Sequence, residues 1–329
     1  MSPHADPRVS FARLARALIF GALGALPFAD SEPRAGTLPA GFAENVAVSG
    51  LNMPMTFDFT PDGAIIFGEK EGAVKIWRDG ALHLAAQLET VSLDESGING
   101  MAVDPDYLTN HHLWIFRTME NTLHQRLSRF TVTGNVITDE LVVMEFFSAS
   151  TIHHAGCIRF DQQKRLYVST GDDDRASTAP QNRFDPHGKM LRINRDGSVP
   201  PDNPFFDGIG GDPRVYAWGF RHPYRFSFEP VTDNLFIGDI GAGGWEELNL
   251  GVPGGNYGWG QVEGFTPPGV PGMIYPVFAY THFSELGNSI IGGEHARPGD
   301  LSPEYEGHYF YGDEAAQQLR HLLLGPSQE

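Results

Sequence analysis

The chain has 329 residues, enough for one large domain or two smaller ones, and its 39 glycines and 24 prolines favour short strands joined by turns over helices. Lysine and arginine together number 23 against 41 aspartates and glutamates, which gives a net charge of −18. A field of that sign repels nucleic acid and anionic membrane surfaces, so partners of those two kinds are excluded.

The N-terminal segment predicts a secretory signal peptide. Arg8, Arg13 and Arg16 precede an apolar run of thirteen residues at 17–29, and a polar stretch follows the run. The run is too short to span a bilayer comfortably, so we expect a cleaved signal peptide at residues 1–29, a linker at 30–40 and a folded domain at 41–329. Pro27 makes the cleavage site imperfect, and an uncleaved anchor is the alternative. The mature chain is therefore expected to be secreted or periplasmic and to lack a membrane span.

From Gly36 onward, short strand-like segments alternate with turn sequences such as Pro61-Asp62-Gly63 and Glu71-Gly72. The segments fall into five groups: 56–59, 65–69 and 74–78; 100–103, 112–117 and 125–132; 157–160, 166–170 and 190–194; 215 through 226–228, 235–239 and 247–250; and 290 through 309–312.

Apart from the signal peptide, only residues 314–324 show a possible helical period. Turns built on aspartate recur within the first four groups, which favours the blades of an all-β propeller, with a sandwich or a β-helix as the alternative. Cys157 is the only cysteine, so no intrachain disulfide is possible, and it is expected to be a buried strand residue.

Several motifs occur in an order that resembles the soluble quinoprotein sugar dehydrogenases of the glucose/sorbosone dehydrogenase family. The resemblance covers roughly residues 41–325 and is carried by Gly50-Leu51, Pro61-Asp62-Gly63, Glu95 to Ala102, Asp104 to Tyr107, His153 to Gly156, Gly171-Asp172, Gly188 to Asn194, Pro201 to Pro204, Gly219 to Pro223, Glu247 to Leu250 and Gly254 to Trp259.

The resemblance implies a six-bladed β-propeller that uses pyrroloquinoline quinone (PQQ) and calcium. The C-terminal part departs from the family pattern. Ala315 and Ala316 stand near an expected basic cofactor ligand, and the strand groups stop at the fifth. We therefore expect a propeller whose last blade is missing or incomplete.

The resemblance also assigns roles to four residues. His153 matches the catalytic base that takes a proton from the C1 hydroxyl of the sugar, and Arg221 matches the arginine that contacts the quinone and stabilises its developing negative charge. His222, next to Arg221, is a candidate cofactor contact. Glu95 stands where some members have a quinone-contacting glutamine, so it is a candidate cofactor ligand. Because a carboxylate there would face an anionic cofactor, the alternative is that Glu95 orients His153 or binds substrate.

For calcium, the resemblance implies the carbonyl groups of Gly241 and Ala242 and the carboxylate of Glu246. The acidic run 172–174 is a second possible cation cluster, although a solvated acidic turn is the preferred interpretation. Trp259 and Tyr257 either line the pocket or pack a turn, and His154 is expected at the rim.

The predicted function is therefore oxidation of an aldose or related sugar at C1 by hydride transfer to PQQ, with a small-molecule sugar and an external electron acceptor as partners. The alternative, from a different class, is a non-catalytic propeller that binds carbohydrate or protein.

Overall fold

The computed structural model describes residue 38 and residues 41–120, 122–176, 178–265 and 269–324. Apart from residue 38, the expected signal peptide (1–29) and linker (30–40) lie outside this part of the chain. Its helical segments are α2 (Tyr107–Asn110) and the 3₁₀ helix η1 (Pro303–Tyr305). These span four and three residues, so neither has the length and apolarity that a membrane span needs.

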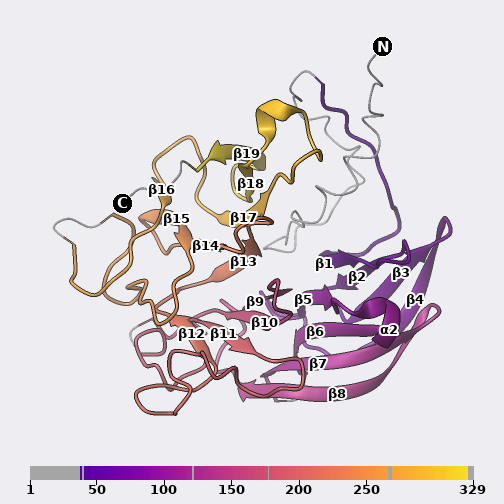
Figure 1. Ribbon diagram of the computed structural model, residues 1–329, viewed down its shortest axis with the longest axis horizontal. Coiled ribbons are helices and arrows are strands. Elements are labelled where there is room, and N and C mark those ends of the chain that lie inside the picture. Colours follow the sequence, from indigo (N-terminus) through magenta and orange to yellow (C-terminus); the bar gives the residue numbers. More distant parts are fainter. Residues whose placement is uncertain (1–37, 39–40, 121, 177, 266–268, 325–329) are drawn as a thin grey trace.

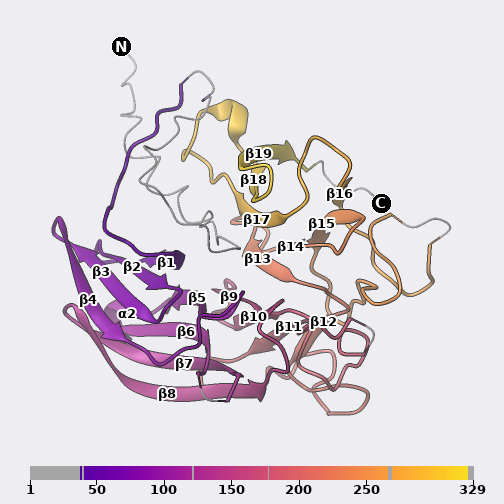
Figure 2. The ribbon, with the colours of Figure 1, turned by 180° about the vertical axis from the view of Figure 1, so that it is seen from behind.

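The strands form five antiparallel sheets arranged around a common centre (Figures 1 and 2). The first two sheets are β1 (Pro54–Phe59), β2 (Ile65–Glu69), β3 (Ala73–Arg78) and β4 (Ala81–Gln87), and β5 (Ile98–Val103), β6 (His112–Thr118), β7 (His124–Thr133) and β8 (Val136–Phe147). The third and fourth are β9 (Ala155–Phe160), β10 (Leu166–Thr170), β11 (Lys189–Ile193) and β12 (Val215–Trp218), and β13 (Pro223–Phe228), β14 (Leu235–Asp239), β15 (Trp245–Leu250) and β16 (Phe278–Thr281). The fifth has three strands, β17 (Ile290–His295), β18 (His308–Asp313) and β19 (Gln318–Leu323).

The sheets stack face to face as the blades of a propeller do. Each of the four apolar clusters of the core lies between two consecutive sheets, and the first, for example, joins Ile66 and Ile76 of one sheet to Ile98 and Ile115 of the next. Both faces of an inner sheet are thereby covered, which explains why its central strands are almost wholly buried. The predicted propeller class is confirmed.

The number of blades differs from the prediction. The part of the chain that the structure describes forms five blades, whereas the sequence predicted a six-bladed ring lacking its last blade. Residues 314–324 form no helix, because this segment pairs with β18 as strand β19. Val215 also belongs elsewhere than expected: it pairs with Leu191 in the outer strand of the third sheet rather than starting the fourth.

The predicted turns connect the strands as their residues require. Between β1 and β2, the amide of Thr60 donates to the carbonyl oxygen of Ala64, and Gly63 takes a left-handed φ of 93°. Gly72, between β2 and β3, has φ 95°, and a Cβ there would lie 2.2 Å from the carbonyl oxygen of Leu88. Glycine is therefore required at that position for both reasons.

The innermost strands, β1, β5, β9, β13 and β17, position the functional residues. Each has six residues, and consecutive ones lie against each other around the centre of the ring (Figure 2). Their first residues lie towards one mouth of the ring and their last residues towards the other. The segments that precede these strands consequently meet at one mouth, and the strand ends meet at the opposite one.

Candidate active site

His153 and Arg221 come together because they occupy equivalent places on neighbouring blades. Each stands two residues before an innermost strand, His153 before β9 and Arg221 before β13. Both line a cavity of about 220 Å³, here termed the strand-start cavity. His153 has a φ of 55°, in the left-handed region, so the main chain turns sharply where it presents the imidazole. The predicted pair thus shares one cavity.

The hydrogen bonds of His153 fix which ring nitrogen carries the proton. Its Nε2 lies 2.9 Å from Nη2 of Arg221, and its Nδ1 lies 2.7 Å from Oδ1 of Asp172. A guanidinium can only donate, so Nε2 accepts and Nδ1–H donates to the carboxylate. His153 is therefore a neutral imidazole whose lone pair points at Arg221, and Nε2 is the atom available to take a proton.

Asp172 is a buried residue that orients both His153 and Trp259. It is 1% exposed, and its Oδ2 also accepts a hydrogen bond of 2.7 Å from Nε1 of Trp259. Burial by itself raises the pKa of Asp172, but the hydrogen bonds from His153 and Trp259 and the charge of Arg221 hold that pKa below its usual range. The carboxylate is thus ionised and oriented towards Nδ1 of His153.

Trp259 and Tyr257 have separate roles. Trp259 binds Asp172, and its ring lies 5.6 Å from the Arg221 guanidinium carbon, within cation–π range. Tyr257 stacks on Phe220 at 4.4 Å and is 4% exposed. Tyr257 is therefore a core residue, whereas Trp259 stabilises the site through its contacts with Asp172 and Arg221.

Glu95 and His222 also line the strand-start cavity. Oε2 of Glu95 accepts a 2.5 Å hydrogen bond from the main-chain amide of His153, so this carboxylate holds the turn rather than the imidazole. His222 is 4% exposed and packs on His153 with ring centroids 5.4 Å apart. Burial lowers the pKa of His222 well below its ordinary value, so it stays neutral, and its Nε2 lies 3.3 Å from Oε2 of Glu95.

Lys70 is a functional candidate that the sequence analysis missed. It is 8% exposed, lines the same cavity and donates from Nζ to the carbonyl oxygen of Asp94 at 2.5 Å. Together with Arg221 it places two cations on the cavity wall. Its position directly after the predicted 65–69 strand was the only available signal.

Of the three residues predicted to hold calcium, Glu246 has both carboxylate oxygens engaged in hydrogen bonds. Gly241 lines the cavity, and the amide of Ala242 donates to Oε1 of Glu263 at 2.6 Å. Glu246 is fully buried, with Oε1 2.5 Å from Nε2 of His282, and burial raises the pKa of Glu246 to about 8. No group of three or more histidine, cysteine, aspartate or glutamate side chains suited to a metal ion occurs in the described residues. Calcium binding there stays a prediction.

Two expectations about the neighbouring polar residues were wrong. His154 is fully buried rather than at the rim, because its ring nitrogens bond to Thr118 Oγ1 at 2.9 Å and to the carbonyl oxygen of Ser150 at 2.8 Å. The acidic run is not a solvated turn either. Asp172 and Asp173 are each 1% exposed and hydrogen-bonded, and only Asp174 faces solvent.

The chain is similar to known proteins in both sequence and structure. A model of the family described as Glucose / Sorbosone dehydrogenase matches residues 51–328. An uncharacterized protein of Synechocystis sp. is 29% identical, with 94% of this chain and 86% of the relative covered. Quinoprotein glucose dehydrogenase B of Acinetobacter calcoaceticus is 29% identical over 76% of this chain, which spans 57% of that relative.

Solved structures with the same fold include a putative oxidoreductase (glucose dehydrogenase) of Thermus, at 29% identity and a TM-score of 0.74, with 85% of this chain and 82% of that one covered. The PQQ-bound aldose sugar dehydrogenase of Streptomyces coelicolor has 25% identity and a TM-score of 0.69, with 85% and 84% covered.

Proposed function

The chain belongs to the glucose/sorbosone dehydrogenase family, and from that premise we propose that it oxidises an aldose or related sugar at C1, with His153 as the base. It is a PQQ-dependent sugar dehydrogenase by family, as the names of the Acinetobacter and Streptomyces relatives indicate. The observation that carries the finer proposal is the acceptor state of Nε2 of His153 inside the strand-start cavity.

The strand-start cavity fits a cofactor that carries several carboxylates and quinone oxygens. Lys70 and Arg221 offer positive charge, and the buried, neutral imidazole of His222 lines the same cavity. We assign these three residues to PQQ binding, with Glu95 bracing the turn of His153. When bound, PQQ supplies the electrophilic centre that takes up the hydride from C1 of the sugar.

The residues of the chain then handle the proton. The C1 hydroxyl proton passes to Nε2 of His153, and the hydride leaves C1 with two electrons, so a lactone forms from an aldose. Asp172, bonded to Nδ1, stabilises the imidazolium that results. Arg221 occupies the lone pair of Nε2 in the structure, so its guanidinium has to turn away from His153 before the substrate hydroxyl can bind there. An external electron acceptor closes the cycle.

Calcium is proposed at the carbonyl groups of Gly241 and Ala242 with Glu246. The support is chemical: the Glu246 carboxyl is buried, oxygen-bearing and near the cavity wall formed by Gly241. A hard cation there would favour the ionised form of the Glu246 carboxyl, whose pKa burial raises to about 8, and would polarise oxygens beside it. Export through a signal peptide at residues 1–29 is likewise proposed, supported by the basic, apolar and polar order of that segment.

Reconstitution tests the proposal. The purified protein with PQQ and Ca²⁺ is expected to reduce a dye when an aldose is added, and PQQ is expected to raise its melting temperature. His153→Ala should lower kcat by roughly 10²–10⁴-fold, the usual contribution of a positioned base, while the PQQ-induced rise in melting temperature persists.

His83→Gln, on outer strand β4, serves as the control because it changes a histidine outside the cavity. If PQQ yields neither dye reduction nor a higher melting temperature, the proposed activity is wrong. Full activity in His153→Ala would leave the activity standing and remove His153 as its base.

A further inference from the structure

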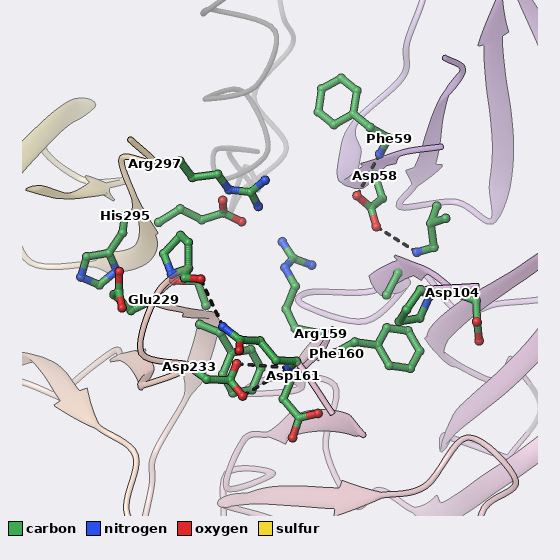
Figure 3. Close-up of a pocket in the computed structure, with 18 of the residues that line it drawn as sticks. Asp58, Phe59, Asp104, Arg159, Phe160, Asp161, Glu229, Asp233, His295 and Arg297 are labelled. Carbon is green, nitrogen blue, oxygen red and sulfur yellow. Dashed lines mark hydrogen bonds between the residues drawn. The ribbon is translucent and has the colours of Figure 1, made fainter. Parts of the chain in front are cut away.

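A larger pocket, of about 500 Å³, lies at the opposite mouth of the ring, where the innermost strands end (Figure 3). Most carboxylates that line it are engaged within the chain. Asp58 accepts hydrogen bonds from the amides of Phe59, at 2.8 Å, and Val103, at 2.9 Å, and Asp161 pairs with Arg165 at 2.6 Å. The bond to Val103 joins the first blade to the second, so these carboxylates stabilise the fold.

A pair of histidines on the fifth blade lies apart from both cavities. His308 belongs to β18 and His321 to β19, and their Nδ1 atoms are 2.8 Å apart, with ring centroids separated by 5.0 Å. His321 pairs with Phe310, two residues along from His308, so both histidines project from the same face of the sheet. The two strands thus bring two equivalent ring nitrogens together.

The histidines are on the face of the fifth blade that points away from the fourth. Tyr309 and Leu322 pack in the apolar cluster between these two blades, and side chains alternate along a strand, so the neighbouring His308 and His321 point to the other side. His308 is half-buried and His321 is exposed. The pair is therefore outside the core and accessible from solvent.

Aromatic rings restrict the movement of the pair. The ring of Tyr305, from η1, contacts both imidazoles, with centroids 6.0 Å from His308 and 5.2 Å from His321. Phe310 lies 5.4 Å from His321 and 5.9 Å from Tyr305. Because these contacts already limit the imidazoles to few orientations, a ligand that binds them loses less conformational entropy.

The hydrogen bond between the two rings uses one proton for two nitrogens. Both atoms are Nδ1, so one ring donates its N–H and the other accepts with a lone pair. When the donor ring takes its other tautomer, with the proton on Nε2, both Nδ1 lone pairs face the same point. Neutral imidazole suits zinc, copper and nickel, whereas calcium and magnesium prefer oxygen ligands. The pair therefore has the chemistry of a transition-metal site, unlike the calcium site proposed above.

A tetrahedral zinc ion fits the pair after a small adjustment. Zinc–nitrogen bonds of about 2.0–2.1 Å place two ligand nitrogens roughly 3.3 Å apart, against 2.8 Å in the structure. Rotation of the exposed His321 side chain supplies the difference. No third histidine, cysteine, aspartate or glutamate joins the pair in the described residues, so water fills the other coordination positions.

We propose that His308 and His321 bind one zinc ion, which cross-links the outermost strand of the fifth blade to its neighbour. Among the described strands, β19 pairs with β18 alone and so forms an edge of its sheet. An ion held by both strands stabilises that edge, because it binds the paired strands and not the separated ones. This site is independent of the proposed oxidation.

Zinc titration of the purified, untagged protein tests the proposal. Calorimetry with Zn²⁺, in buffer that contains excess Ca²⁺ to fill oxygen-ligand sites, is expected to show one zinc ion bound per chain. His308→Phe and His321→Phe keep a ring beside Tyr305 but remove one of the two ligands, so each should weaken zinc binding at least tenfold. Zinc should raise the melting temperature of the parent protein and not that of the variants, whose melting temperatures without zinc should match the parent value.

His124→Phe is the matched control. His124 is likewise half-buried on a strand, but its Nδ1 lies 2.8 Å from Oε1 of Glu145 instead of a histidine. This variant should bind zinc within twofold of the parent protein.

Zinc binding that persists in the double variant His308→Phe/His321→Phe, or that is lost in His124→Phe, would place the ion elsewhere and overturn the proposal. Absence of zinc binding by the parent protein, or an equal affinity for Mg²⁺, would overturn it too. None of these outcomes depends on dye reduction, so the proposed oxidation stands or falls separately.

Discussion

Asp172 joins His153 and Trp259 through its two carboxylate oxygens, and its effect on catalysis can be isolated. Asp172→Asn keeps the size of the side chain but removes the charge that stabilises the imidazolium of His153. We expect kcat to fall by at least about 100-fold while KM and the PQQ-induced change in melting temperature change little. Steady-state kinetics of dye reduction measure this. An unchanged kcat would show that Asp172 serves only the packing of Trp259.

His295 gives a prediction about pH. Burial lowers its pKa to about 4, from the ordinary value of about 6.5, although Glu229 acts in the other direction. Between these values the unfolded chain binds a proton that the folded chain does not, so stability falls as pH is lowered from about 6.5 to 4. His295→Phe should flatten that part of the curve of melting temperature against pH. An equally steep curve in the variant would assign the pH dependence to other groups.

Sequence reasoning found some of these residues and missed others for a physical reason. His153 and Arg221 carry motif positions, and their common place before an innermost strand brings them together. Asp172 is 19 residues from His153 and Trp259 is 87 from Asp172, so only the closed ring reveals their contacts. His154 was misjudged because a buried polar residue and a rim residue look alike until their partners are known.

The loop that leads into β9 is held in place by hydrogen bonds to the carboxylate of Asp173. Its carboxylate accepts hydrogen bonds from the amides of Ala149, at 2.7 Å, and Ser150, at 3.1 Å, and from the Ser148 hydroxyl. In Asp173→Asn an NH₂ group replaces one acceptor, so a buried amide loses its partner. The expected loss is about 1–3 kcal/mol of unfolding free energy, measured by urea denaturation.

Asp174→Asn is the matched control. Asp173 and Asp174 both have a left-handed φ, of 58° and 55°, which asparagine tolerates, but Asp174 is exposed. Its change should stay within about 0.5 kcal/mol. Equal losses in the two variants would mean that the backbone conformation, and not the loop contacts of Asp173, determines stability here.

At the level of strands, the sequence predicted the inner and middle strands better than the outer ones. The segments 65–69, 166–170 and 235–239 match β2, β10 and β14 residue for residue, because buried strands bounded by aspartate and glycine turns carry a strong signal. Outer strand β8 is mostly exposed and β4 is partly exposed, and both lack a regular apolar alternation, so no pattern indicated them.

For the whole molecule, the propeller class followed from recurring turns and family motifs, but the blade count did not. The expectation of a sixth blade came from the family resemblance, whereas the five groups of strands correspond to the five blades, although Val215–Trp218 was attributed to the wrong group. That pairing joins β12 to β11, whose strands are separated by a long loop. Long-range pairing of this kind is a property of the folded ring rather than of any local pattern.

The six-residue length of the innermost strands has a consequence for how mutations combine. His153 lines the cavity before the innermost strands, whereas Glu294 lines the pocket where they end, so the length of a six-residue strand separates the two mouths. Sites so far apart, with no shared partners, usually contribute additively to folding free energy. His153→Gln and Glu294→Gln should therefore sum to the double variant within about 0.5 kcal/mol in urea denaturation, whereas a coupling above about 1 kcal/mol would contradict this. Additivity would make the two mouths separate targets for engineering. Substitutions in the segments that precede the innermost strands would then alter one mouth, and substitutions in the segments that follow them would alter the other.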